Sequence, residues 1–297
     1  TGEGLPALKQ AIDEILGSLG PRVNTGKPRL PVDRVFSITG FGTVVTGTLA
    51  GGTFRVDDQI EILPSMERGR IRGLQSHKKQ EIEVFPGSRT AMNLGGVDIS
   101  SVSRGDTIAH PGDFVPTQRI DARLQLVADA SVGVKHDDEI KLFIASTETT
   151  ARIRLLKKQS LEAGDWGWVQ LELEHPIVAE KDDRFIIRRM SPAQTIGGGT
   201  VVDPHPNRRH KLNDDQVISR FESLTSTSKL DYLLVLIGDH PFITITEILQ
   251  LVEDTDQTID TLRSLVKAEK VRQIKVKDED GERYLDGFYW QLVTGKL

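Results

Sequence analysis

Two glycine-rich stretches near the N-terminus have the residue types that could hold the phosphates of a nucleotide. Residues 2–7 (GEGLPA) satisfy a loose dinucleotide-binding pattern, but no strand precedes them, and Arg22 stands where an acidic residue is required about 20 positions later. Residues 20–28 resemble a phosphate-binding loop, but one residue too many separates the glycines, and Pro28 replaces the hydroxyl that would bind magnesium. We therefore expect no nucleotide at either stretch.

Residues for metal or nucleophilic catalysis are equally poorly placed. The seven histidines lack the His-Glu-x-x-His spacing of a zinc site, and the absence of cysteine excludes disulfides and thiolate ligands. No Gly-x-Ser-x-Gly elbow is present to position a serine nucleophile. Residues 278–281 mimic the Asp-x-x-Gly of GTPases, but they read as a hairpin turn. The sequence therefore predicts no catalytic residues and no metal site, and the chain should not hydrolyse a nucleotide alone.

Length and composition describe a globular chain with several cores. Its 297 residues suffice for about two to four domains. No apolar run approaches the roughly 20 residues that span a bilayer and no signal-peptide pattern opens the chain, so we expect a cytoplasmic protein without a membrane partner. The net charge is −5, but residues 212–297 hold 10 Lys and Arg against 16 Asp and Glu, whereas residues 1–211 hold 28 against 27. An RNA is therefore expected on the first two-thirds of the chain.

The elements that must position any site begin with one amphipathic helix over residues 1–19, which starts so abruptly that we interpret the chain as a fragment of a larger protein. Residues 30–115 and 119–202 then change to short alternating segments separated by Gly and Pro, which is typical of barrels. The expected strands are 32–38, 43–49, 58–63, 69–76, 81–85 and 88–94 in the first set, and 119–127, 139–144, 149–156, 166–173 and 184–189 in the second.

The pattern becomes helical after residue 206. Apolar positions around Leu230, Ile245 and Ile259 mark three helices, and strands follow at residues 270–276 and 283–288. Three helices followed by a β-hairpin are the layout of a winged helix. The predicted fold is therefore mainly β, with two antiparallel β-barrels and an α+β C-terminal part.

A long run of motifs carries a family resemblance. Residues 33–48 (DRVFSITGFGTVVTGT) resemble the opening of domain 2 in translational GTPases of the elongation factor Tu class. The likeness continues, in order and in register, through residues 77–79, 86–89 and 102–108. Residues 194–201 (QTIGGGTV) resemble the end of domain 3.

Within that class, three features resemble the selenocysteine-specific elongation factors. They are the pair Asp33-Arg34, the run GGGTVVDPHP over residues 197–206, and the winged helix that follows where elongation factor Tu ends. The resemblance implies the following domains: 1–20, the last helix of a GTPase domain and its linker; 21–115, β-barrel domain 2; 116–208, β-barrel domain 3; and 212–297, the first winged helix of a C-terminal array.

By this resemblance, the parent protein binds selenocysteinyl-tRNA and delivers it to the ribosome at recoded UGA codons. Later winged helices, absent from this chain, would recognise an mRNA selenocysteine-insertion hairpin. GTP and Mg²⁺ would belong to the GTPase domain of the parent, whereas no cofactor is expected on these residues. Two alternatives stay open: another tRNA-binding factor of the elongation factor Tu class, for general elongation or initiation, and a winged-helix DNA-binding regulator.

The resemblance assigns the aminoacyl pocket for selenocysteine to Asp33, Arg34, Arg89 and His77. A selenol is more acidic than a thiol, whose pKa is about 8.5, so selenocysteine is largely an anion at neutral pH and serine is neutral. Two arginines in a partly desolvated pocket would favour the anion. Neighbours in a regular strand point to opposite faces, so Asp33 and Arg34 share a pocket only if the strand is bulged or just beginning. A surface ion pair and a structural histidine are the alternatives.

On the second barrel, the resemblance implies contacts with the acceptor and T stems of the tRNA. The residues assigned to these contacts are Arg188, Arg189, Gln194, Thr195, Gly197 and Gly198. Residues 194–200 would bring backbone N–H groups close to the RNA, because glycine allows close approach, or they would form a tight barrel turn. Residues 208–211 (RRHK) are either phosphate contacts or a solvated linker. Residues 212–297 are expected to act as a spacer that does not bind the mRNA hairpin tightly.

Overall fold

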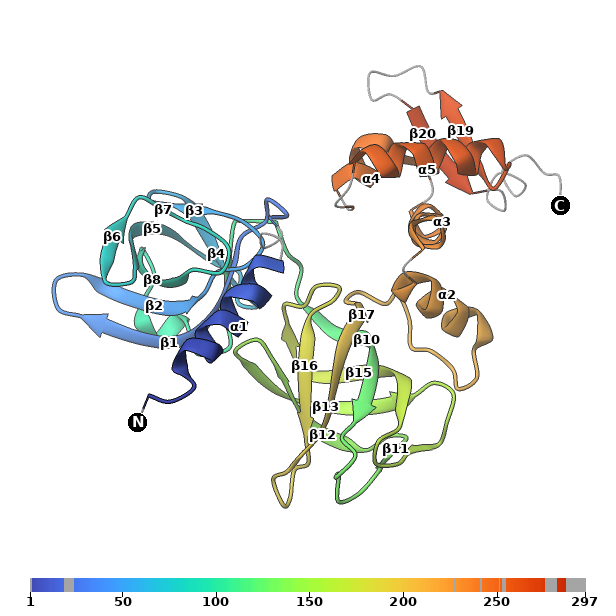
Figure 1. Ribbon diagram of the computed structural model, residues 1–297. Coiled ribbons are helices and arrows are strands. Elements are labelled where there is room, and N and C mark those ends of the chain that lie inside the picture. Colours follow the sequence, from blue (N-terminus) through green and yellow to red (C-terminus); the bar gives the residue numbers. More distant parts are fainter. Residues whose placement is uncertain are drawn as a thin grey trace. The chain divides into compact units, whose positions relative to one another are not determined.

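The computed structural model describes residues 2–18, 24–226, 228–240, 242–250, 252, 255–275 and 282–286. The chain divides into two compact units, whose elements are labelled in Figure 1. One unit contains residues 1–116 with the segments 145–148 and 176–178, and the other contains the rest of the chain. No described helix is long and apolar enough to cross a membrane.

The N-terminal unit begins with helix α1 (Leu5–Ser18), as its apolar spacing predicts. The apolar face of this helix is open to solvent, with side chains that remain between 45% and 60% exposed: Leu5, Leu8, Ile12, Ile15 and Leu16. Helix α1 therefore contributes none of its described side chains to the buried core of the barrel that follows.

Six strands close the first barrel in the order β4-β9-β1-β2-β8-β5, and β5 pairs back with β4. β6 extends this sheet beyond β5, while β3 and β7 form a separate pair. The bounds are β1 (Arg29–Ile38), β2 (Gly42–Thr48), β3 (Phe54–Arg55), β4 (Gln59–Leu63), β5 (Glu67–Ser76), β6 (Lys79–Glu81), β7 (Glu83–Val84), β8 (Arg89–Gly95) and β9 (Thr107–Ala109), with one 3-10 turn at Ile99–Ser101.

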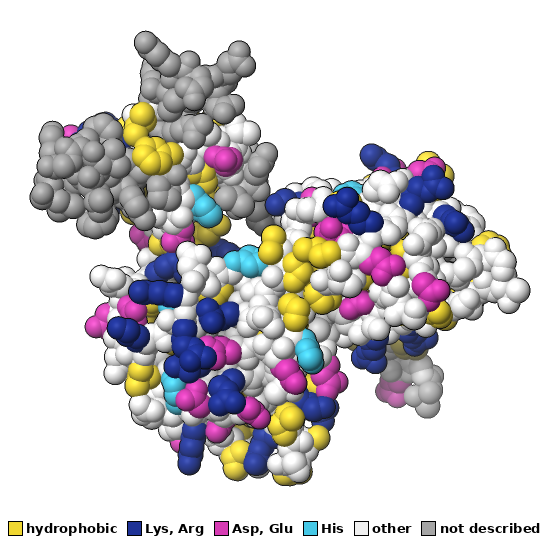
Figure 2. Space-filling model, turned by 180° about the vertical axis from the view of Figure 1, so that it is seen from behind, with side chains coloured by type: hydrophobic (Ala, Val, Ile, Leu, Met, Phe, Trp, Pro, Cys, Tyr) yellow, Lys and Arg dark blue, Asp and Glu magenta, His cyan; other side chains and the backbone are white. Residues whose placement is uncertain are grey.

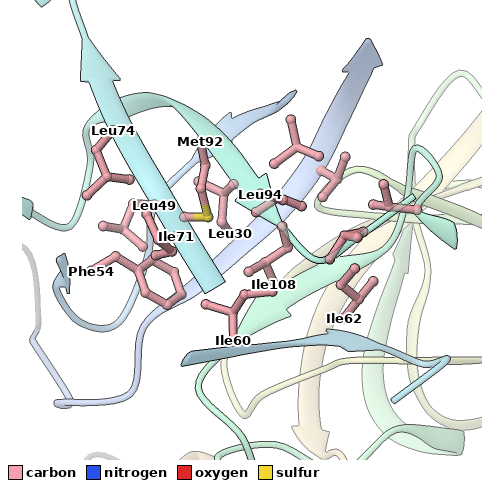
Figure 3. Packing of buried hydrophobic residues seen from close by; sticks show 14 of the residues in the cluster. Leu30, Leu49, Phe54, Ile60, Ile62, Ile71, Leu74, Met92, Leu94 and Ile108 are labelled. Carbon is pink, nitrogen blue, oxygen red and sulfur yellow. The ribbon is translucent and has the colours of Figure 1, made fainter. Parts of the chain in front are cut away.

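Apolar residues at alternate positions of these strands meet inside the first barrel, as Figure 3 shows. Phe54 and Met92 are among the largest side chains there, and both are fully buried. The predicted strand 81–85 is divided at Ile82, which is 80% exposed, and the three-residue strand β9 was not predicted. The long strands were predicted because their alternation is regular.

The second barrel is a closed ring of six strands in the order β10-β15-β13-β12-β16-β17. The bounds are β10 (Thr117–Leu126), β12 (Glu139–Ile144), β13 (Thr147–Leu155), β15 (Trp166–Ile177), β16 (Arg184–Arg188) and β17 (Thr195–Asp203), with a separate pair β11 (Val134–Lys135) and β14 (Ser160–Leu161). The predicted class, mainly β with two antiparallel barrels, is therefore confirmed.

Strand β17 contains the glycine run and closes the ring by pairing with β10 on one side and β16 on the other. A Cβ on Gly197 would lie 2.5 Å from the carbonyl oxygen of Gln125, and a Cβ on Gly199 would lie 2.1 Å from that of Arg123. Both distances are shorter than van der Waals contact. The glycines are therefore required by the close approach of β17 to its neighbouring strands, in an extended strand and not in a turn.

Helix α2 (Asp215–Thr225) was not predicted, although Val217, Ile218, Phe221 and Leu224 have helical spacing. Asp214 caps its N-terminus by accepting a hydrogen bond from the backbone N–H of Val217. These apolar side chains pack in one buried cluster with Leu156, Trp168 and Val202 of the second barrel. A domain boundary at 208–212 therefore divides a packed core, and α2 belongs with the barrel.

Arg220 of α2 forms ion pairs with the end of β17 and with the end of the helix that comes after α2. Its Nη2 donates to Asp203 at 2.8 Å and to Asp239 at 2.7 Å, and its Nε donates to Asp239 at 3.1 Å. Asp203 is the last residue of β17, and Asp239 is the last residue of α3 (Lys229–Asp239). Burial lowers the pKa of Arg220, but these two carboxylates outweigh it and raise the pKa.

The remaining elements form the predicted winged-helix layout. After α3 come β18 (Ile243–Thr244), α4 (Ile245–Gln250), α5 (Thr255–Lys267), β19 (Val271–Lys275) and β20 (Glu282–Asp286). The strands pair in the order β18-β20-β19, and a second apolar cluster fills the space between the helices and this sheet. The turn predicted at 278–281 lies outside the described residues.

Candidate functional site

Asp33 and Arg89 form a two-point ion pair on the first barrel, although 56 positions separate them in sequence. Arg89 donates from Nη2 to Oδ1 of Asp33 at 2.9 Å and from Nη1 to Oδ2. The hydroxyl of Thr46 donates to the same Oδ1 at 2.7 Å. The carboxylate is therefore held from β8 by a guanidinium and from β2 by a hydroxyl.

An irregularity in β1 explains how Asp33 reaches this position. Val32 pairs with Gly47 and Arg34 with Thr46, so the β1–β2 register shifts between Val32 and Arg34, leaving Asp33 as the extra residue. Gly47 lets the strands approach here, because a Cβ on it would lie 2.3 Å from the carbonyl oxygen of Pro31. The sequence required a bulge or a strand start if Asp33 and Arg34 were to share a pocket, and the bulge is present.

The charges around Asp33 keep it ionised. Partial burial raises its pKa, but the hydrogen bonds from Arg89 and Thr46, with the charges of Arg89 and Arg34, outweigh the burial and lower the pKa. The pKa of Arg89 is raised, chiefly by its hydrogen bond to Asp33. Arg34 is exposed and acts on the carboxylate through its charge. Both arginines predicted for the pocket therefore act on the same carboxylate.

His77 lies at the turn that leads from β5 to β6, with a positive φ of 50° and an exposed side chain. Ser76 connects it to the ion pair: the Ser76 hydroxyl donates to the carbonyl oxygen of Arg89 at 3.1 Å and lies 3.3 Å from Nδ1 of His77. The structure therefore brings His77 to the edge of the barrel where β8 begins with Arg89.

This arrangement is suited to binding an anion. Arg89 has five N–H groups, of which two donate to Asp33, so three are left to meet a ligand. With two arginines and one carboxylate, the local charge is positive. The sequence did not indicate Thr46 or Gly47 as site residues. Their contacts with Asp33 and with the backbone of β1 depend on the bulge, and no residue pattern predicts a bulge.

The residues predicted to contact tRNA on the second barrel fall into two groups. Arg188 pairs with Thr195 where β16 meets β17, and the backbone N–H of Arg189 donates to the carbonyl oxygen of Gln194 at 2.9 Å, so these four share one hairpin. Arg189 also lines a groove of about 370 Å³ with residues of the 132–140 segment. This hairpin is half-exposed or exposed and is accessible to an RNA.

Gly197 and Gly198 form the second group, and they lie within strand β17. Both pair with β10 and with β16, and Gly197 is buried. Their backbone groups belong to the barrel ladder, and the close approach that they permit is to neighbouring strands. Contact of these two glycines with RNA stays a prediction, and their ladder pairing commits their backbone groups to the barrel.

Residues 208–211 do not form a free basic cluster. Arg209 donates to both carboxylate oxygens of Glu172, and Arg208 lies 3.3 Å from Asp214. His210 is buried, with its Nε2 at 2.7 Å from Oδ2 of Asp121, a carboxyl with no exposed surface. Arg209 and His210 therefore fasten the chain to the barrel, and Arg208 pairs with the residue that caps α2. The solvated-linker reading is wrong for the buried His210, whereas phosphate contact by the exposed Arg208 and Arg209 stays a prediction.

Basic side chains elsewhere on the second barrel are interspersed with acidic ones, as Figure 2 shows for one face. Arg152 pairs with Glu139 at 2.8 Å and Arg154 with Asp137 at 3.1 Å. This alternation limits nonspecific attraction of a polyanion. The β16–β17 hairpin therefore remains the best RNA-facing candidate on this barrel.

The described residues offer no side-chain cluster for Mg²⁺. Among the described residues, no group of three or more His, Asp or Glu side chains could hold a metal ion. Both glycine-rich stretches near the N-terminus lack the residues that phosphate and magnesium need.

Two known families match the two barrels. The family described as elongation factor Tu domain 2 matches residues 42–109, and the family described as the β-barrel domain of selenocysteine-specific elongation factor matches residues 118–208. Two curated relatives carry the name selenocysteine-specific elongation factor. The one from Desulfomicrobium baculatum is 35% identical over 240 residues, or 80% of this chain, and the one from Haemophilus influenzae is 29% identical over 216 residues, or 72%.

The matched part of the chain spans less than two-fifths of the length of these relatives. The matched residues cover 38% of the Desulfomicrobium protein and 33% of the Haemophilus protein. Within this chain, the elongation factor Tu domain 2 match lies on the first barrel, and the match to the β-barrel domain of selenocysteine-specific elongation factor lies on the second.

Proposed function

This chain belongs to the family of selenocysteine-specific elongation factors, and on that basis we propose that it is the part of such a factor that binds selenocysteinyl-tRNA for delivery to the ribosome at recoded UGA codons. The observation that carries the proposal is the Asp33–Arg89 pair with Arg34 beside it. The first barrel would hold the aminoacyl end, and Arg188 to Thr195 would contact the acceptor and T stems.

Discrimination between selenocysteine and serine rests on charge. A selenolate can accept charge-assisted hydrogen bonds from the free N–H groups of Arg89 and from Arg34, each worth roughly 1.5–3 kcal/mol, whereas a neutral hydroxyl gains less. A difference of about 3 kcal/mol gives roughly a hundredfold preference. Asp33 holds Arg89 in place and leaves the pocket with net positive charge, so the anion remains favoured.

The partners and cofactors of the longer protein belong to the same proposal. The parent factor would be a cytoplasmic GTPase that binds GTP and Mg²⁺ through a domain outside this chain. Its partners would be the ribosome and an mRNA hairpin, and the latter would be bound by later winged helices. The acidic balance of residues 212–297 supports a spacer role for the first winged helix.

Replacement of Arg89 tests the proposal. We expect Arg89→Ala to reduce the preference for selenocysteinyl- over seryl-tRNA at least about tenfold, the factor for about 1.4 kcal/mol, because a charge-assisted donor is lost. The dissociation constants are measured on the same tRNA carrying either amino acid, with the parent factor bound to GTP.

Arg55→Ala is the matched control, because Arg55 is also a surface arginine of the first barrel with one carboxylate partner, Glu83 at 3.1 Å. It should leave the preference unchanged. Equal affinity of the unaltered factor for selenocysteinyl-, seryl- and other aminoacyl-tRNAs would instead indicate a general tRNA carrier of the elongation factor Tu class.

A further inference from the structure

Thr46 has a place in the candidate pocket that the sequence does not reveal. Its hydroxyl donates to Oδ1 of Asp33 at 2.7 Å, the oxygen that also accepts the 2.9 Å bond from Nη2 of Arg89. We infer that Thr46 is a positioning residue for selenocysteine selection, which acts by fixing the carboxylate that orients Arg89. This inference rests on the proposed function and adds a residue to it.

The backbone of Thr46 is fixed on both sides. It pairs with Arg34 of β1 and with Ala91 of β8, so β2 lies between the two strands that supply Asp33 and Arg89. A β-branched side chain has restricted χ1 freedom, which makes the hydroxyl a well-placed donor. By contrast, Asp33 is the extra residue of a bulge and has no regular partner across the ladder.

The contacts of Asp33 show why a second donor matters. Arg89 has a long side chain that is 51% exposed, so its guanidinium can move together with the carboxylate that it binds. The side chain of Thr46 is half-buried and short. Thr46 is therefore the residue that holds the ion pair in a fixed position relative to the barrel backbone. Without its hydroxyl, the carboxylate and the guanidinium would stay paired but would sample more orientations.

The inference predicts that selectivity falls while general tRNA binding remains. Thr46→Val keeps the shape of the side chain and removes the donor, so the preference for selenocysteinyl- over seryl-tRNA should fall about fivefold, as for loss of roughly one hydrogen bond. The affinity for seryl-tRNA should stay within about twofold, since serine does not need the oriented charge. Thr46→Ser keeps the hydroxyl and should retain most of the preference.

An NMR titration of the Asp33 carboxyl supplies a second readout, which reports directly on the hydrogen bond from Thr46. The Thr46 hydrogen bond helps to lower the Asp33 pKa, so the pKa should rise in Thr46→Val and return in Thr46→Ser. Thr39→Val is the control, because Thr39 is exposed at the turn of the same β1–β2 hairpin. Circular dichroism identifies a variant that fails to fold, in which case Thr46→Ala replaces Thr46→Val.

The outcomes separate this inference from the function beneath it. If the unaltered protein prefers selenocysteinyl-tRNA and Thr46→Val shows the same preference, the role of Thr46 is refuted. A loss in Thr46→Ser as large as that in Thr46→Val also refutes it. If the unaltered protein has no preference, the proposed function fails, and the Asp33 titration decides on Thr46: a raised pKa in Thr46→Val supports its positioning role, and an unchanged pKa overturns it.

Discussion

Asp33 is a carboxylate that remains charged because two arginines and a hydroxyl surround it. Its pKa is lowered, so the ion pair with Arg89 stabilises the fold above the ordinary pKa of an aspartate and loses that contribution only as the pH falls through the lowered value. Asp33, Arg34 and Arg89 therefore keep their charges throughout the neutral and mildly acidic range.

A pH dependence of selectivity follows from this. Between neutral pH and about pH 5, Asp33 and both arginines do not change charge, whereas the selenolate becomes protonated. We expect the preference for selenocysteinyl-tRNA to decline as the pH falls, with seryl-tRNA affinity unchanged. Binding measured over this range, with the Asp33 carboxyl followed by NMR, checks this. A titration of Asp33 within the range would contradict it.

Residues that share a charge pattern and a family motif could be grouped from the sequence, whereas contacts that depend on burial could not. Asp33, Arg34 and Arg89 could be proposed as a group from the sequence, and the structure brings them to one carboxylate. His210 could not, because its partner Asp121 lies 89 positions away in a strand that the sequence reads as plain alternation. Burial raises the pKa of Asp121, against the hydrogen bond and charge of His210.

Among the elements, strand β17 has a sequence that does not show the regular alternation from which a strand is predicted. Regular alternation predicts a strand only when apolar side chains mark one face, and three successive glycines leave no such mark. The need for glycine arises from contacts with β10 and β16, which are distant in sequence. Helix α2, in contrast, had a visible apolar spacing and a capping aspartate, so it could have been predicted.

A glycine substitution tests the account of β17. Gly199→Ala would place a methyl group 2.1 Å from the carbonyl oxygen of Arg123 and 2.6 Å from the ring of Phe185, so we expect a loss of about 3 kcal/mol or more in the free energy of unfolding. Gly73→Ala in β5 meets no atom within 4 Å and should change it by less than about 1 kcal/mol. Urea denaturation measures both, and equal midpoints would disprove the explanation.

At the scale of the whole molecule, the second barrel does not end where the sequence pattern changes from strands to helices. Helix α2 comes after that change and still packs against the barrel. Phe221 and Leu224 of α2 share a buried cluster with Trp168 of the barrel, and the ring centroids of Phe221 and Trp168 lie 5.7 Å apart in an edge-to-face arrangement. Composition and periodicity change near residue 206, but the buried members of this cluster continue to Leu224, and the partly buried Tyr232 and Val235 of α3 pack against it. The sequence pattern therefore changes before the last residues that pack against the barrel.

Two truncations distinguish these boundaries. Removal of residues 227–297 keeps α2 and should leave the second barrel cooperative, whereas removal of residues 213–297 exposes Trp168 and should lower its free energy of unfolding by about 3 kcal/mol or more. Both truncations remove Trp290, so Trp166 and Trp168 are the remaining tryptophans and report the change by fluorescence. Identical emission and identical urea midpoints would contradict the boundary after α2.

Arg220 gives this boundary a mechanical meaning. One guanidinium holds the last residue of β17 and the last residue of α3, so α3 cannot swing away from the barrel without breaking charge-assisted bonds at the strand that completes the ring. A force that pulls on the C-terminal winged helix would therefore act first on β17, the strand that closes the second barrel.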